Sequence, residues 1–435
     1  MRKKIVQAAI ALVMVLTMAL GTGVAVAQEE GTGPITYNSY MGDPVPRRVD
    51  TMIVEMWNEA HPEMPVQHSI IAHEDFKQAI RAYLTAEPAP DVMTWFAGNR
   101  ARFFIDRGLI ADISDMWEEN GFDDVYAPGF KALATVGDGI YFLPTSYYWW
   151  AVYYRPSLFE EAGITEVPET WDDFLAACDT LNEAGITPIT IGTRYPWTTG
   201  AWFDYLNMRV NGPEFHIDLM LLKESYTDPR VREVFDYWKQ LLDHNCFIEN
   251  AAAYTWQEGV SFMANKEAAM YLMGQFIADE VSANYAEQFA TEDGGVDLDF
   301  FRFPIINPDV PIGEDAPTDG YFIAANARNL AGGKAFLAFL GSREVQQLAF
   351  EEIGRLPTRT DVDISGAGEA TQKGIALIQG ADYVAQFYDR DTTPEMAELG
   401  MSAFVAFWDD PASIDSLLEN LEVNRARIAE EMAAQ

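Results

Sequence analysis

One stretch decides the fold class of this chain: residues 137–174, GDGIYFLPTSYYWWAVYYRPSLFEEAGITEVPETWDDF. Eight of the fourteen residues from Tyr141 to Tyr154 are aromatic. A buried strand is usually built from Val, Ile and Leu, so this many rings indicate that one face of the segment borders something other than an ordinary core. A sugar suits such a surface, because its apolar C–H face stacks on aromatic rings.

A helix start follows the aromatic segment. Pro168, Thr170 and Asp173 have the spacing of a capping box, in which the Thr hydroxyl accepts from the Asp173 N–H and the Asp carboxylate reaches back to the Thr N–H. A strand followed closely by a capped helix is the repeating unit of an α/β protein.

The residues before this stretch continue the alternation. Strands are predicted at 35–40, 66–72 and 91–94, the last ending at Trp95 and Phe96. Asp43-Pro44 is predicted to cap a helix whose apolar residues recur at helical spacing, and a second such stripe runs from Phe76 to Leu84. Such alternation predicts parallel-rich sheets flanked by helices, with ligands at the carboxyl ends of the strands. A chain of 435 residues exceeds one typical domain, so we expect two.

The first 27 residues are typical of a secretory signal peptide. Arg2, Lys3 and Lys4 precede an apolar run from Ile5 to about Leu20, and Ala25-Val26-Ala27 suits cleavage before Gln28. No cysteine lies near this cleavage site to carry a lipid. We therefore expect a soluble protein in the periplasm or another extracytoplasmic space, without a lipid anchor.

The net charge narrows the range of partners. It is −38 for the whole chain, so nucleic acid is an improbable partner because a polyanion is repelled by such a field.

Cys178 and Cys246 are the only cysteines, and the sequence leaves open whether they form a disulfide or are simply buried. The five histidines are scattered without metal-ligand spacing, and we expect no metal and no cofactor.

Several short motifs, in this order, resemble the family 1 extracellular solute-binding proteins, the sugar-capturing subunits of ABC importers that include maltose-binding protein. Within the quoted stretch they are Ala162-Gly163-Ile164 and the run from Pro168 to Phe174. Further matches cover most of the chain: Ala89 to Trp95, Gly108 to Ile113, Phe262 to Gly274 with Asn265 where the family usually has Gly, Ala335 to Leu340, and Gly354 to Arg359.

The resemblance implies a two-lobed periplasmic-binding-protein fold whose α/β lobes are joined by crossover hinge strands. The crossings are expected near Pro144 to Trp149, near Phe300 to Pro304, and within Ala331 to Ser342. The N-terminal lobe would then comprise residues 34–145 plus about 303–335, and the C-terminal lobe 146–302 plus about 336–435.

The resemblance also implies which residues contact the solute. Trp95 stands where the family has a stacking aromatic, Asn99 and Arg100 where a polar pair bonds sugar hydroxyls, and Phe276 where Trp is more usual. With residues from loops at expected strand ends, the candidate ligand-binding set is Tyr40, Glu74, Trp95, Asn99, Arg100, Tyr147, Tyr148, Tyr195, Trp197, Trp202, Trp256, Gln275, Phe276, Asp319 and Arg355. Trp57, Trp117, Trp171 and Trp238 lie on helical stripes or at caps and are expected in the core.

The function implied is capture of a mono- or oligosaccharide by a monomer, which closes its lobes and delivers the sugar to permease subunits of an ABC transporter. One alternative is a binding protein for another small solute, such as a phosphorylated polyol or a polyamine. An alternative of another class is a secreted carbohydrate-active enzyme, which needs two carboxylates about the scissile bond. With 67 acidic residues, accidental carboxylate pairs are certain. No G-x-S-x-G, H-E-x-x-H or P-loop motif is present, so no catalytic residue is assigned.

Overall fold

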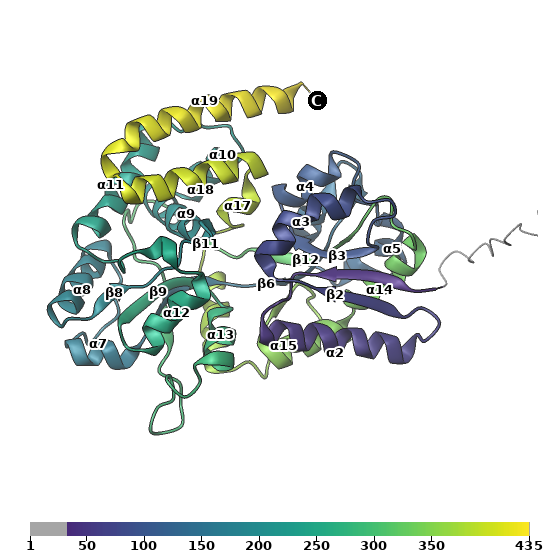
Figure 1. The fold of residues 1–435 in the computed structure, drawn as a ribbon, viewed down its shortest axis with the longest axis horizontal. Coiled ribbons are helices and arrows are strands. Elements are labelled where there is room, and N and C mark those ends of the chain that lie inside the picture. The colour runs from purple at the N-terminus through teal and green to yellow at the C-terminus, as the bar shows by residue number, and fades with distance from the viewer. Residues whose placement is uncertain (1–32, 435) are drawn as a thin grey trace, which may run out of the picture.

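The computed structural model describes residues 33–434, which form two lobes side by side (Figure 1). Each lobe has its own sheet, flanked by helices, and its own hydrophobic core. This confirms the two-lobed α/β fold expected from the sequence. The expected signal peptide at residues 1–27 lies outside the described residues. None of the helices within 33–434 is long and apolar enough to cross a membrane.

The first lobe is built on a six-stranded sheet with strand order β13-β6-β12-β3-β1-β2. Pairing of β1 with β2 and β3 is parallel, whereas β12 runs antiparallel to both β3 and β6. The strands are β1 (Ile35–Ser39), β2 (Val66–Ile70), β3 (Val92–Phe96), β6 (Leu143–Tyr147), β12 (Thr318–Ile323) and β13 (Leu356–Pro357). The helices are α2 (Pro44–Ala60), α3 (His73–Thr85), α4 (Asn99–Ile105), α5 (Ser114–Glu119), α6 (Pro128–Ala134), α14 (Leu330–Leu340) and α15 (Arg343–Ile353). The short hairpin β4 (Thr135–Val136) and β5 (Gly139–Ile140) precedes β6.

The second lobe is built on a four-stranded sheet with strand order β10-β7-β9-β8. A two-stranded parallel sheet, β11 with β14, accompanies it. The strands are β7 (Trp150–Tyr154), β8 (Thr187–Ile189), β9 (Ala268–Gly274), β10 (Asp299–Phe301), β11 (Gly313–Asp315) and β14 (Tyr383–Ala385). The helices are α7 (Pro156–Ala162), α8 (Trp171–Glu183), α9 (Trp197–Asn211), α10 (Pro213–Met220), α11 (Pro229–Asp243), α12 (Trp256–Ala264), α13 (Ile277–Asn284), α16 (Glu369–Gln379), α17 (Tyr388–Asp391), α18 (Pro394–Asp409) and α19 (Ile414–Ala433).

The predicted capping box is confirmed at the start of α8. The Thr170 hydroxyl accepts from the Asp173 N–H at 3.3 Å, and the Thr170 N–H donates to the Asp173 carboxylate at 3.3 Å. Both bonds satisfy N–H groups that a helix start leaves without intrahelical partners. Trp171, which follows Thr170, is 4% exposed and packs in the second-lobe core, where Trp238 also lies. Trp57 and Trp117 belong to the first-lobe core, so all four tryptophans are placed as expected.

Within residues 33–434 the chain crosses between the lobes three times, and only the first crossing lies where the sequence predicted it. It falls between Tyr147, the last residue of β6, and Trp150, the first of β7. The second crossing joins Asp315 of β11 to Thr318 of β12, later than the expected 300–304. The third lies between Asp363, whose N–H donates to Gln347 of the first lobe, and Glu369 of α16, later than the expected 331–342.

Packing explains both differences. Phe300, Phe301 and Phe303 are buried in the second-lobe core, because β10 pairs with β7 there. Phe336 and Leu337 of α14 are buried in the first-lobe core. Residues 303–315 therefore belong to the C-terminal lobe and residues 336–357 to the N-terminal lobe, which reverses the boundaries expected for these segments.

Cys178 and Cys246 are both buried free thiols in the structure. They lie against each other inside the second lobe, and burial raises the pKa of the Cys178 thiol.

Candidate functional site

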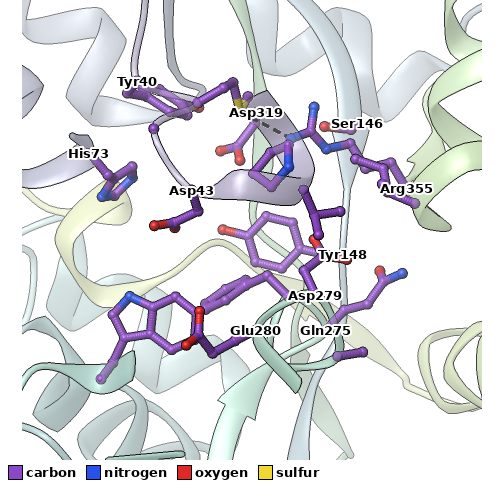
Figure 2. A pocket seen from close by; sticks show the side chains of 18 of the residues that line it. Tyr40, Asp43, His73, Ser146, Tyr148, Gln275, Asp279, Glu280, Asp319 and Arg355 are labelled. Carbon is purple, nitrogen blue, oxygen red and sulfur yellow. Dashed lines mark hydrogen bonds between the residues drawn. The ribbon is translucent and has the colours of Figure 1, made fainter. Parts of the chain in front are cut away.

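A cavity of about 180 Å³ lies between the lobes (Figure 2). Residues of both lobes line it, from the turn after β1 and helix α3 in the first lobe to helices α12, α13 and α17 in the second. Ser146 of β6 and Tyr148 of the first crossing also line it. The position matches the rule that ligands of α/β folds bind outside the carboxyl ends of strands, here those of β1 and β9.

Aromatic rings from the second lobe form one wall. Phe276, between β9 and α13, is at the centre of this wall, with its ring centroid 5.1 Å from that of Trp256, 5.6 Å from Tyr148 and 5.9 Å from Trp150. Gly274 makes this position possible, since a Cβ there would lie 2.4 Å from the Phe276 ring. Trp256 and Tyr148 are partly exposed, so their rings are available to a ligand.

Arg390 of α17 is one of the cationic side chains that line the cavity, with Lys77 and Arg355. Its Nη1 donates to Asp319 Oδ1 at 2.7 Å and its Nη2 donates to the Tyr148 hydroxyl at 2.8 Å. Burial alone would lower the pKa of the guanidinium, but Tyr148 and Asp319 outweigh burial and raise it. Arg390 is therefore a fixed charge with a fixed orientation, which suits it to hydrogen-bond a polar ligand.

Carboxylates line the wall beside the aromatic rings. Asp43 is the residue before α2, and its side chain makes no capping bond to that helix. It accepts instead from Gln257 Nε2 at 3.4 Å, and Figure 2 shows it in the space between His73 and Glu280. Burial raises the pKa of Asp279 to about 6, with Arg355 acting in the opposite direction and Asp43 adding to the rise. Burial likewise raises the pKa of Glu280.

A further polar group lies on α3. Burial and the neighbouring Lys77 lower the pKa of His73, so its ring is neutral near pH 7. Burial acts to raise the pKa of Glu74, but Lys77 and His73 together lower it to about 2. Lys77 therefore faces an ionised Glu74, with 3.3 Å between Nζ and Oε1.

The structure brings together eight of the fifteen candidate residues at this cavity. They are Tyr40, Tyr148, Trp197, Trp256, Gln275, Phe276, Asp319 and Arg355. Four more, Glu74, Trp95, Arg100 and Tyr195, line a second cavity beside the first. Asn99, Tyr147 and Trp202 line neither of these two cavities.

Trp95 was predicted to follow the third strand, and its observed place differs from that prediction. It lies within β3, not after it, and is 1% exposed. Its ring packs against Phe96 and Phe104, with centroids 4.8 Å and 5.9 Å away. Because side chains alternate across a strand, extending β3 to Phe96 fixes Trp95 between the sheet and its covering helices. It reaches only the second cavity.

The residues that miss both cavities are held by other contacts. Trp202 is 1% exposed in the second-lobe core, because nearly every side of α9 is buried. The Tyr147 ring packs on Phe130, 5.2 Å between centroids. The Asn99 amide donates to the Asp391 carbonyl at 2.6 Å.

Several lining residues were not predicted. They are Asp43, His73, Lys77, Ser146, Trp150, Asp279, Glu280, Phe387, Asp389 and Arg390, with apolar neighbours from Met41 to Pro46. The unusual charge run Asp389-Arg390-Asp391, next to buried Tyr388, was the one local sign of the α17 contribution. Asp43 was predicted as a helix cap, the role such a residue most often has before Pro.

The combination of ring faces with charged hydrogen-bonding groups suits a sugar. Aromatic rings stack on the C–H face of a pyranose, while carboxylates and guanidinium bond to its hydroxyls. Within residues 33–434, no group of three or more His, Cys, Asp or Glu side chains is arranged to hold a metal ion.

Comparison with known proteins agrees with this geometry. The family model described as "Bacterial extracellular solute-binding protein" matches residues 39–347. An uncharacterized ABC transporter extracellular-binding protein of Pyrococcus horikoshii is 25% identical over 66% of this chain and 62% of its own length. The xylose/arabinose-binding protein XacG of Haloferax volcanii is 24% identical over 72% of this chain and 67% of its own length. The crystal structure of the bacterial solute receptor AcbH, described as having an exclusive preference for β-D-galactopyranose, superposes with a TM-score of 0.83. It is 31% identical, and the match covers 92% of this chain and all of that one.

Proposed function

Because the chain belongs to the family of bacterial extracellular solute-binding proteins, we propose that it captures a sugar between its lobes and delivers it to an ABC importer. The observation that carries this proposal is a cavity lined both by the rings around Phe276 and by Arg390 and Asp319. The ring faces would bind the apolar side of a pyranose and the charged groups its hydroxyls.

Two relatives support a small sugar as the solute. The receptor preferring galactopyranose and the xylose/arabinose-binding protein both take monosaccharides by their descriptions. The cavity between the lobes, at about 180 Å³, is also the smaller of the two spaces, since the neighbouring cavity measures about 570 Å³. The set we assign to the sugar comprises Tyr148, Trp256, Phe276, Asp279, Asp319 and Arg390.

The mechanism we propose is lobe closure. A sugar contacts the first lobe through Asp319 and the second through Phe276 and Arg390, so it stabilises the arrangement in which both lobes meet. The closed outer surface is then what the permease subunits recognise.

We further propose that the chain is a non-enzymatic monomer. The signal at residues 1–27 would export it to the periplasm or extracytoplasmic space, where it is not lipid-anchored.

The carboxylates give a second candidate, a cationic solute such as a polyamine. Asp43, Asp279 and Glu280 lie close enough that Asp43 raises the pKa of the other two. An ammonium group between them would remove that repulsion. The Arg390 guanidinium favours the sugar over this candidate, because a positive charge in the same cavity repels an ammonium group.

A thermal-shift screen tests the proposal. The probes are galactose, glucose and xylose, the disaccharides β-1,4-galactobiose, cellobiose and xylobiose, and, as other solute classes, spermidine and glycerol 3-phosphate. A solute at 100 times its dissociation constant stabilises the folded state by ~2.7 kcal/mol. We expect a sugar to raise the melting temperature and to be recovered unchanged. Stabilisation by spermidine alone, or hydrolysis of a disaccharide, would contradict the proposal.

A further inference from the structure

A second cavity of about 570 Å³ lies beside the proposed sugar site. Its lining includes Tyr195, Arg81 and Arg100, together with Glu398 and Met401 of α18. Three side chains, Lys77, Trp197 and Asp389, line both cavities. These three residues are therefore the partition between the two spaces, and we refer to them as the partition.

Charges hold the partition together. Lys77 Nζ lies 3.7 Å from Asp389 Oδ2, and Arg100 donates to the same carboxylate from the side of the second cavity. Lys77 Nζ also stands 5.7 Å from the centroid of the Trp197 ring. The Asp389 side chain is 5% exposed and that of Lys77 is 13% exposed, so these charges interact with little screening by water.

The partition joins the two lobes. Lys77 and Arg100 stand on α3 and α4 of the first lobe, whereas Asp389 and Trp197 stand on α17 and α9 of the second. The contacts between them exist only while the lobes meet. A ligand passing from one cavity into the other would occupy the space where Lys77 and Asp389 approach each other, and would separate an ion pair that is largely desolvated.

We propose that this partition limits the length of the ligand: it ends the sugar site after one unit, and its removal opens the site into the second cavity. This rests on the proposed function. A disaccharide could place its second unit only by breaking the Lys77–Asp389 contact, which lowers its affinity. A monosaccharide leaves this contact intact. The partition thus creates length selectivity by lowering the affinity for the disaccharide relative to that for the monosaccharide.

The test is calorimetric titration with three pairs of probes: galactose and β-1,4-galactobiose, glucose and cellobiose, xylose and xylobiose. For the pair that binds, the quantity measured is the dissociation constant of the disaccharide divided by that of the monosaccharide. This ratio cancels any contact that Lys77 itself makes with the first sugar unit. We expect a ratio of about ten or more for the native chain, and a fall of about tenfold or more in Lys77→Ala.

Control variants separate the partition from general effects. Lys334→Ala removes a lysine that pairs with Asp115 and lines neither cavity, and should leave the ratio unchanged. Asp389→Asn removes the charge that pairs with Lys77 and keeps the size of the side chain, so it should lower the ratio even if Lys77→Ala folds poorly. Adding Tyr195→Ala to Lys77→Ala should remove part of the disaccharide affinity gained.

The outcomes are distinct. A native ratio near one, or a ratio that neither Lys77→Ala nor Asp389→Asn lowers, overturns the inference while the sugar function stands. If none of the six sugars binds, the proposed function fails first and the inference fails with it.

Discussion

The Arg390 guanidinium donates to Asp319 Oδ1 at 2.7 Å, and this bond links the four-residue helix α17 of the second lobe to strand β12 of the first. Asp319 stands four residues after Asp315, where the chain crosses between the lobes for the second time. Arg390 also donates to Tyr148, in the first crossing. One side chain therefore lines the proposed sugar site and contacts the segments on which relative motion of the lobes depends.

Replacing Arg390 by lysine should weaken sugar binding by about tenfold or more. A guanidinium bonds to two partners at once with fixed geometry, whereas an ammonium is a flexible point charge that does not reproduce both bonds. The measurement is calorimetric titration of Arg390→Lys beside Arg427→Lys, an exchange on the exposed helix α19. Equal affinities in both variants would show that Arg390 has no part in the site.

Phe276→Ala should weaken sugar binding roughly 30-fold or more, because truncating an aromatic anchor at the centre of an interface commonly costs ~2 kcal/mol. Phe276 is only partly buried, so the free energy of unfolding of the unliganded protein should change much less than for a core aromatic. Titration gives the first quantity and denaturant melts the second. Unchanged affinity would place the sugar elsewhere.

Trp95→Ala should lower the stability of the protein strongly and its sugar affinity only a little. The indole is 1% exposed and packs between Phe96 and Phe104, so its loss should cost ~3–5 kcal/mol of stability. Monosaccharide affinity should change by less than in Phe276→Ala, since Trp95 does not line the cavity between the lobes. A large loss of affinity with unchanged stability would restore the sequence-based expectation that Trp95 is a sugar platform.

Sugar affinity should depend on pH through Asp279. Burial raises the pKa of this carboxyl to about 6, so it is ionised above that pH and neutral below it. Sugar hydroxyls donate more strongly to a carboxylate than to a neutral carboxyl, and affinity should therefore fall as the pH falls from 7 to 5. Asp279→Asn should flatten this dependence.

The raised pKa of Asp279 affects stability in the opposite direction from sugar affinity. Between its ordinary value of 3.8 and about 6, the folded protein binds more protons at Asp279 than the unfolded chain does. The contribution of Asp279 to the free energy of unfolding therefore increases as the pH falls through this window. Melts of the unliganded protein and of Asp279→Asn isolate this contribution. If the two proteins show the same pH dependence of both stability and affinity, Asp279 does not titrate there.

Local patterns in the sequence predicted the local structure well. The Thr170–Asp173 capping box and the first strands and helices depend on neighbours along the chain, which one sequence displays. The lobe that a segment joins depends on distant partners instead. The aromatic run Phe300 to Phe303 was predicted to be a crossing between the lobes, yet its rings pack in the second-lobe core. Trp95 was expected just after its strand, but β3 extends two residues further, to Phe96, and includes it.

The candidate site was predictable only in part for the same reason. Aromatic residues beside strand ends, such as Phe276 and Trp256, follow from the chain order of strands and helices. Arg390 and Asp389 come from a four-residue helix more than 200 residues beyond Tyr148, and only tertiary packing brings them to it. Asp43 resembled a helix cap, and only the structure shows that its carboxylate is not used for capping.

The most direct test of a sugar held between the lobes is a crystal structure of the protein grown with the sugar that binds most tightly in the screen. The account predicts one pyranose unit with a face on Phe276 or Trp256 and hydroxyls bonded to Arg390 and Asp319. It also predicts that Lys77 and Asp389 remain in contact beside the sugar. A sugar bound on an outer surface, or only in the second cavity, would contradict the account.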